Sequence, residues 1–178
     1  VARADHIKNA IGEALSEGGR RENAIVATKV LHHNNSDGVV ERQLDPALKR
    51  LGMDYVDLYI VHWPNLALDI EPFLEQMFQM VEKGKARYIG VSNFYMDRLP
   101  VAEEMGIVSL QPPYNVVWRH LDTDGLNFCR EHDIAVTPYS PLAQGLLTGR
   151  FTRGNEEPHA SVRESNLMFQ EPAFSKAK

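Results

Sequence analysis

The sequence has little of what would place the protein outside a reducing, aqueous compartment. It holds a single cysteine, Cys129, so no disulfide can form within the chain. Charged or polar residues interrupt its apolar runs well before the roughly 20 residues that a membrane-spanning helix needs. The first residues lack the charged-then-apolar order of a signal peptide. We therefore expect a cytoplasmic protein.

Basic clusters are also lacking. Acidic residues exceed basic ones, 24 against 19, and no run or stripe of Lys and Arg stands out, so neither nucleic acid nor a membrane is an expected partner. With 178 residues, 43% of them hydrophobic, the chain can bury one core, and we expect a single domain over 1–178. After Arg150 the composition, with glycine, proline and adjacent glutamates, predicts an irregular loop region over 151–178.

The most informative stretch that is present is DYVDLYIVHWP, residues 54–64. β-Branched and aromatic residues fill it almost throughout, which is typical of a strand buried on both faces in a parallel sheet. His62 follows at the carboxyl end of this strand, where the catalytic side chains of (β/α) barrels gather. A single histidine at a strand end is more often a packed, hydrogen-bonded residue, so its role depends on what the other strands carry.

Strand-like and helix-like segments alternate along the chain. Pro46 should kink or split the second of the helices near Asp45. Apolar runs and apolar spacing of this kind indicate βα units joined by right-handed parallel crossovers, which is an α/β fold. The predicted helices cover 5–17, 37–51, 71–83, 96–105 and 121–132, and the predicted strands cover 23–30, 54–64, 87–94, 107–111 and 134–140.

Each predicted strand ends in a polar or ionisable side chain. One such end carries little information, but five at the same edge of a parallel sheet predict a functional site. Taken singly, the serine and asparagine of the third strand could form a turn and a helix cap, and the tyrosine of the fifth could simply pack. In chain order the strand-end residues are Lys29, His62, Ser92 with Asn93, Gln111, and Tyr139 with Ser140.

These motifs resemble those of the aldo-keto reductase superfamily, in its order and spacing over residues 7–151. The resemblance implies a (β/α)8 barrel of the TIM-barrel type that binds a nicotinamide cofactor, NADPH or possibly NADH, without a Rossmann fold. It also implies that the protein reduces a small-molecule carbonyl, an aldehyde or a ketone, to an alcohol. The motifs that carry the resemblance are ATKV with Lys29, LKRLGMDYVDLYIVHWP with His62, GKARYIGVSNF, Gln111 followed by PPYN and Arg119, and YSPLAQGLLTGR.

The resemblance assigns roles to individual residues and no metal site. Lys29 and His62 match the family's catalytic lysine and histidine, which lower the pKa of a proton-donating tyrosine and orient the carbonyl. Trp63 matches a wall of the substrate pocket. The expected cofactor contacts are Ser92, Asn93 and Gln111 with the nicotinamide carboxamide, Tyr139 stacked on the nicotinamide ring, and Ser140, Leu142, Gly145 and Arg150 near the phosphates.

Part of the family's pattern has no counterpart in this sequence. In the family, the catalytic aspartate and the proton-donating tyrosine lie upstream of the helix on which this chain opens. The family's first two strands and its last strand are not found either. We therefore interpret the chain as an incomplete barrel of about five βα units, corresponding to strands 3–7, and expect it to be inactive on its own.

Two other functions are compatible with the same residues. A non-catalytic regulatory module of this fold would keep the nicotinamide contacts without turnover. An unrelated barrel enzyme could use Lys29 as a Schiff-base nucleophile, but the phosphate or carboxylate grips of such enzymes are not found, whereas SPLAQG fits a dinucleotide.

Overall fold

Helices and strands alternate in the computed structural model, which describes residues 2–17 and 19–149. Arg150 and the irregular region predicted over 151–178 lie outside the described residues. No helix in the described part is long and apolar enough to cross a membrane. The elements are α1 (Ala2–Ser16), a 3-10 turn (Arg21–Asn23), β1 (Ala27–Val30), α2 (Val39–Leu51), β2 (Val56–Val61), α3 (Glu71–Glu82), β3 (Ala86–Ser92), α4 (Leu99–Glu104), β4 (Ser109–Gln111), α5 (Asp124–Glu131), β5 (Ala135–Val136) and a 3-10 segment (Ala143–Thr148).

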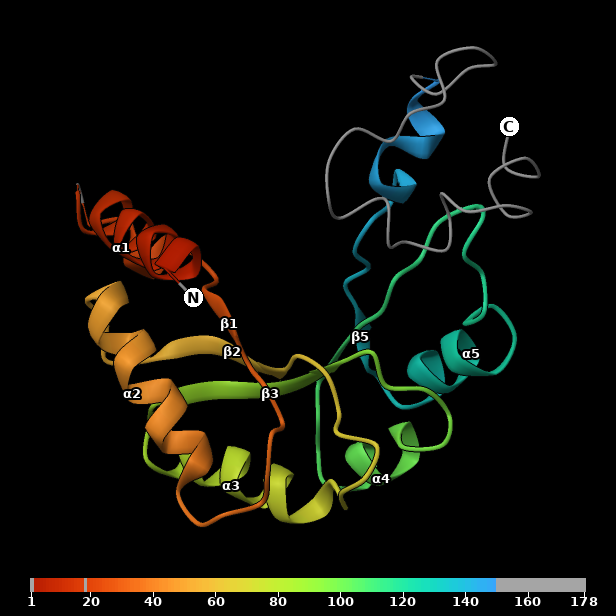
Figure 1. The fold of residues 1–178 in the computed structure, drawn as a ribbon, viewed down its shortest axis with the longest axis horizontal. Coiled ribbons are helices and arrows are strands. Elements are labelled where there is room, and N and C mark those ends of the chain that lie inside the picture. Colours follow the sequence, from red (N-terminus) through yellow and green to blue (C-terminus); the bar gives the residue numbers. More distant parts are fainter. Residues whose placement is uncertain (1, 18, 150–178) are drawn as a thin grey trace.

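The five strands form one parallel sheet in the order β1-β2-β3-β4-β5. Each strand pairs with the next one along the chain, so that Lys29 lies opposite Ile60, Ile60 opposite Gly90, and Gly90 opposite Ser109. The helices follow one another around the outside of the curved sheet (Figure 1). Sequential parallel pairing with the helices on one side is the arrangement of a (β/α) barrel. The predicted α/β fold of about five βα units is thus confirmed.

The hydrophobic core lies between the outer face of the sheet and the helices. Strand residues that point outward, such as Tyr59 and Leu110, are fully buried. They meet the apolar sides of α2 and α3, where Leu44, Phe73 and Met77 have no exposed surface. This core holds the strands through their outer face. The side chains at the carboxyl ends of the strands are therefore not needed for the core.

The inner face of the sheet is partly open within the described residues. Ile25 is 87% exposed and Tyr88 57% exposed, although both are large apolar side chains. Since closing a barrel covers this face of every strand, these residues occupy positions that a closed barrel would bury. A hollow of about 350 Å³ lies on this face and is lined by Ile25, Asp57, Leu58, Arg87, Tyr88, Val108, Ser109, Ala135 and Thr137.

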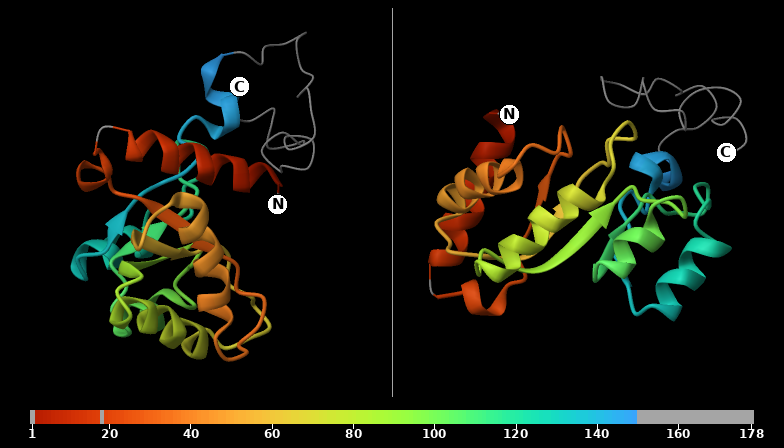
Figure 2. Two further views of the ribbon diagram at one scale, coloured as in Figure 1. Left: turned by 90° about the vertical axis from the view of Figure 1, so that its left-hand side faces the viewer. Right: turned by 90° about the horizontal axis from the view of Figure 1, so that it is seen from below.

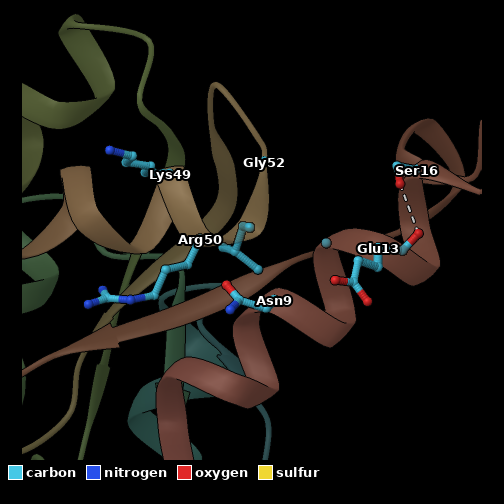
Figure 3. A pocket seen from close by; sticks show the side chains of 8 residues that line it. Asn9, Glu13, Ser16, Lys49, Arg50 and Gly52 are labelled. Atoms are coloured by element: carbon cyan, nitrogen blue, oxygen red, sulfur yellow. Dashed lines mark hydrogen bonds between the residues drawn. The ribbon is translucent and has the colours of Figure 1, made fainter. Parts of the chain in front are cut away.

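Helix α1 packs against α2 through a glycine. A Cβ atom on Gly12 would lie 2.4 Å from the backbone oxygen of Leu51, so no larger residue fits there without moving a helix. Both views of Figure 2 show α1 beside α2. A groove of about 260 Å³ runs along this contact (Figure 3). Asn9 and Glu13 of α1 and Lys49 and Arg50 of α2 are among the residues that line it.

Helix α2 is continuous from Val39 to Leu51. Of the predicted kink or split near Asp45, the split is therefore wrong. The missing N–H of Pro46 costs the helix about 3 kcal/mol at most positions. Burial of Leu44, Ala47 and Leu48 on the same helix offsets this cost, and Pro46 itself is exposed. Helix α2 starts at Val39 and not at 37 as predicted; Gly38 in the left-handed region precedes it, and no side chain caps it.

A buried carboxylate holds the amino ends of the strands together. Asp57 accepts hydrogen bonds from the N–H of Val26 at 2.9 Å and from Arg87 at 3.0 Å, and it pairs with Arg21 at 2.8 Å. Both guanidinium groups lie over the ring of Tyr55, at 4.2 and 4.4 Å from its centroid. Burial raises the pKa of Asp57, but the Val26 N–H and the two arginines outweigh burial and hold the pKa below its usual value.

We expect Asp57→Asn to lower the free energy of unfolding of the full-length protein by about 2 kcal/mol or more, because it leaves two arginines without their buried partner. The matched control is Asp45→Asn, which removes only an exposed pair with Lys85 and should cost no more than about 1 kcal/mol. Urea unfolding measures both. Because the folded pKa of Asp57 is lowered, its contribution is present at neutral pH and is lost as the pH falls through that pKa. Equal losses in the two variants at pH 7 would contradict this assignment.

Candidate functional site

The polar residues that end the strands lie at one edge of the sheet. Lys29 is the penultimate residue of β1, and His62 follows β2 directly. Ser92, the last residue of β3, lies opposite Gln111, the last residue of β4. Tyr139 follows β5 and forms an isolated parallel bridge with Pro113. The structure therefore brings these predicted site residues to the same end of the sheet.

Lys29 and His62 face the open inner side. Lys29 pairs with Ile60, and His62 comes two residues later on the same side of β2, since side chains alternate along a strand. Burial lowers the pKa of Lys29. Burial, and then the positive charge of Lys29, lowers the pKa of His62. His62 is therefore a neutral imidazole at neutral pH, beside a fixed positive charge.

The backbone, rather than the ring, holds His62 in place. Its N–H donates to the Val30 oxygen at 2.8 Å, and its carbonyl accepts from Nδ2 of Asn93 at 2.8 Å. Its imidazole has no hydrogen-bond partner among residues 2–17 and 19–149. The ring is thus free to bind a group that enters the site.

Asn93 links the ends of three strands. It is 4% exposed and has a φ of 61°, a left-handed conformation that asparagine tolerates better than most residues. Its Nδ2 donates to the His62 carbonyl and, at 3.1 Å, to Oγ of Ser92. Its Oδ1 accepts from the hydroxyl of Tyr139 at 2.7 Å. Asn93 thereby joins β2, β3 and the residues after β5.

The remaining hydrogen-bonding capacity of this network suits a planar amide. Both Nδ2 protons of Asn93 are used, but Oδ1 retains one lone pair. Oγ of Ser92 donates to the Gln111 backbone oxygen at 2.7 Å and can still accept. The side-chain amide of Gln111 has no partner in the described part of the chain, and it can both donate and accept. A ligand carboxamide could donate its N–H groups to Oδ1 of Asn93 and Oγ of Ser92, and its oxygen could accept from the side-chain amide of Gln111.

The segment after Tyr139 has an unusual backbone. Ser140, Ala143, Gln144 and Gly145 all have positive φ values, and only glycine adopts that region without cost. Internal hydrogen bonds hold the segment, from the N–H of Ala143 to Ser140 and from the N–H of Gly145 to Leu142. Asn115 also ties it to the β4 side, donating from Nδ2 to the Ser140 oxygen at 3.0 Å. These hydrogen bonds hold the segment in this backbone shape.

Several residues near the site were not predicted from the sequence. Tyr95 comes two residues after Asn93 and contacts the ring of His120, with the centroids 4.9 Å apart. Burial raises the pKa of Tyr95, and burial together with Tyr95 raises that of Tyr139, so the two phenols lie near each other. The only sequence signal for Tyr95 is its position three residues after the end of β3. No group of His, Cys, Asp and Glu that could hold a metal occurs in the described residues.

Comparisons with known proteins agree with this geometry. The model of the Aldo/keto reductase family matches residues 5–175. The "Aldo-keto reductase YhdN" of Bacillus subtilis is 34% identical over 174 residues, which are 92% of this chain and 52% of the relative. A "Probable voltage-gated potassium channel subunit beta" of Arabidopsis thaliana is 33% identical over 160 residues, 81% of this chain and 49% of the relative.

A solved structure shows the same likeness in three dimensions. The crystal structure of an aldo-keto reductase from Klebsiella pneumoniae in complex with NADPH superposes with a TM-score of 0.72 and 27% identity. The superposition covers 82% of this chain and 52% of the Klebsiella pneumoniae chain. The chain thus spans about half the length of the curated relatives it matches.

Proposed function

Because this chain belongs to the aldo/keto reductase family, we propose that the whole protein is an NADPH-dependent oxidoreductase that reduces aldehydes or ketones to alcohols by hydride transfer. The observation that carries the proposal is the Asn93 network, which leaves a set of acceptors and donors complementary to a carboxamide beside the ring of Tyr139.

The cofactor contacts in this proposal follow the geometry of the strand ends. Ser92, Asn93 and Gln111 hold the nicotinamide carboxamide, and Tyr139, with its hydroxyl fixed on Asn93, stacks on the ring. When it is bound, the cofactor supplies the hydride. The segment with positive φ values approaches the phosphates, through Ser140, Leu142 and Gly145. Arg150, which lies outside the described residues, is proposed from the resemblance alone to meet the same phosphates.

Lys29 and His62 act on the carbonyl side. Hydride addition builds negative charge on the carbonyl oxygen, which fixed dipoles and positive charge stabilise. The neutral His62 ring, free of other partners, donates a hydrogen bond to that oxygen and orients it. Lys29 contributes its charge nearby and lowers the pKa of a proton-donating phenol. Trp63, 51% exposed directly after His62, forms a wall of the substrate pocket.

We expect the full-length protein to bind NADPH more tightly than NADH, and fluorescence titration measures both dissociation constants. Gln111→Leu should weaken both cofactors by the same factor, because the carboxamide is common to them. Arg150→Ala should also weaken both cofactors, because the pyrophosphate that it is proposed to meet is common to them. Equal affinity of the unchanged protein for both cofactors would contradict the preference.

A regulatory role is the second candidate, favoured by the likeness to the plant protein named as a potassium channel β subunit. A module of that kind would bind cofactor through the same residues without turnover. Following NADPH absorbance with 4-nitrobenzaldehyde distinguishes the two functions. Tight NADPH binding by the full-length protein with no oxidation of NADPH by any aldehyde would favour the regulatory role.

A further inference from the structure

A buried histidine outside the strand ends connects two loops at the site. His32, two residues beyond β1, is 4% exposed. Its Nδ1 accepts the backbone N–H of Asn65 at 3.1 Å, and its Nε2 lies 2.7 Å from Oδ1 of Asn35. Its ring also packs on Phe73 of α3, with the centroids 4.5 Å apart. His32 therefore touches three separate parts of the chain.

These contacts fix the protonation state of His32. A backbone N–H can only donate, so Nδ1 carries no proton. The proton is then on Nε2, where the Oδ1 of Asn35 accepts it. Adding a second proton would put N–H against N–H at Asn65 and remove that hydrogen bond. The loop contact exists only while His32 is the neutral Nε2–H tautomer.

The segment that His32 holds, residues 62–70, carries residues of the candidate site. It begins with His62 and Trp63. Asn35, itself held by His32, donates from Nδ2 to the Asp69 oxygen at 2.9 Å, near the other end of the segment. Asn65 stabilises the turn between by accepting the Ala67 N–H at 3.0 Å. His32 thus contacts the segment at Asn65 directly and at Asp69 through Asn35.

We infer that His32 is a positioning residue for the candidate site: its neutral tautomer fixes segment 62–70, and with it Trp63, whereas protonation of Nδ1 releases the segment. This inference rests on the proposed function, because the positioned wall matters for carbonyl binding. No described atom of His32 is placed to react, since both ring nitrogens are occupied by protein groups.

The charges around His32 favour the neutral form. Burial lowers its pKa, the hydrogen bond to Asn35 raises it, and the positive charges of Arg98 and His33 lower it further. Arg98, at the start of α4, pairs with Asp97 and donates to the Leu66 oxygen at 3.4 Å. From segment 62–70 Asp69 contributes its backbone oxygen to Asn35, and α3 presents only the uncharged Phe73 ring. The hydrogen bond from the Asn65 N–H to Nδ1 of His32 is therefore present at neutral pH. It is lost as the pH falls through the lowered pKa of His32.

Two variants separate positioning from packing. His32→Asn keeps an acceptor near the place of Nδ1 but cannot titrate. His32→Phe keeps the ring against Phe73 but has no acceptor. We expect His32→Asn to leave the KM for 4-nitrobenzaldehyde at pH 7.5 near that of the unchanged protein. We expect His32→Phe to raise KM about threefold to tenfold, as for one lost hydrogen bond, with kcat little changed. His33→Asn, at the exposed neighbouring histidine, is the control, and its KM should stay near that of the unchanged protein.

The closing experiment follows the position of segment 62–70 by fluorine-19 NMR, without turnover. The full-length protein carries 5-fluorotryptophan, and the signal of Trp63 is the one that disappears in Trp63→Phe. Between pH 7.5 and 5 the signal should move in the unchanged protein and in His33→Asn but stay in place in His32→Asn. All of the proteins in this NMR comparison carry His62→Gln as well, so that His62 cannot titrate beside Trp63, and a shift that persists in His32→Asn would then overturn the inference. Nitrogen-15 imidazole spectra showing a proton on Nδ1 of His32 at pH 7.5 would also overturn it. Absence of carbonyl reduction in every protein, with these spectra as expected, would instead overturn the proposed function.

Discussion

Replacing His62 with alanine in the full-length protein is expected to lower kcat for aldehyde reduction about a hundredfold or more, because a group that contacts the developing oxyanion acts mainly in the transition state. The affinity for NADPH should stay close to that of the unchanged protein, since the His62 backbone, and not its ring, joins the Asn93 network. Stopped-flow turnover and fluorescence titration measure the two quantities separately.

The structure supplies sharp controls for this experiment. His33→Ala removes an exposed imidazole from the neighbouring loop and should leave kcat unchanged. His62→Gln keeps an N–H donor of similar reach and should recover part of the loss seen in His62→Ala. If turnover survived in His62→Ala while NADPH affinity collapsed, His62 would be a cofactor or structural residue, and the proposed role would be wrong.

The strand that precedes His62 was well predicted because burial on both faces leaves a clear pattern. Residues 54–64 read as one strand, and the structure has β2 from Val56 to Val61. Helix α3 was equally clear, since its apolar spacing matches a face that is fully buried at Phe73, Leu74 and Met77. Where tertiary burial and local pattern agree, the sequence determines both the element and its position.

Local chemistry and tertiary context disagreed elsewhere. The predicted strand over 134–140 is reduced to Ala135–Val136, because Pro138 has no N–H to give to a ladder at the edge of the sheet. Helix α4 begins at Leu99, with Pro100 in its first turn, and not at Met96 as the apolar spacing suggested. Ile7 and Ile11 of α1 are exposed within the described residues, although their spacing predicts a buried face.

The candidate site was predictable as a set of positions but not as a network. Polar strand ends indicate which residues share an edge, and the register confirms that Ser92 and Gln111 are neighbours. The direction of each hydrogen bond depends on backbone angles, such as the left-handed φ of Asn93, that no residue pattern specifies. The roles of these residues, and of Arg150 outside the described part, stay predictions until the variants are measured.

The second large effect concerns the 178 residues by themselves, which we expect to show no measurable carbonyl reduction with NADPH. A reductase of this kind needs an acid placed to protonate the alkoxide. The sequence contains six tyrosines, and four of their hydroxyls are engaged away from Lys29. These are Tyr55 with Arg87, Tyr59 with the Val40 oxygen, Tyr114 with Asp122, and Tyr139 with Asn93.

The two remaining tyrosines are poorly placed. Tyr88 lies opposite Leu58, one pair of residues nearer the amino ends of the strands than Lys29 and its partner Ile60. Tyr95 lies beyond Asn93, against His120, and burial raises its pKa, which makes it a weaker acid. No described tyrosine therefore offers Lys29 a phenol whose pKa it could lower.

The open inner face of the sheet adds a second, independent reason. Lys29, His62 and Trp63 are all exposed, so this side of the site has no wall within the described residues. A hydride donor held on one side only is poorly aimed, and about 1 Å of misplacement can cost roughly a hundredfold in rate. Both reasons predict that the 178 residues by themselves still bind the cofactor through the Asn93 network but do not catalyse the reduction.

The test follows NADPH absorbance with 4-nitrobenzaldehyde for these 178 residues and for the full-length protein under the same conditions. Circular dichroism first confirms that the short chain is folded, and a folded short chain with no turnover beside an active full-length protein is the expected result. Tyr88→Phe and Tyr95→Phe in the short chain identify any acid that it supplies itself. Robust turnover by the short chain, abolished by one of these two substitutions, would show that a tyrosine of this sequence is the proton donor. The expectation that Lys29 and His62 act with a tyrosine from outside these 178 residues would then be wrong.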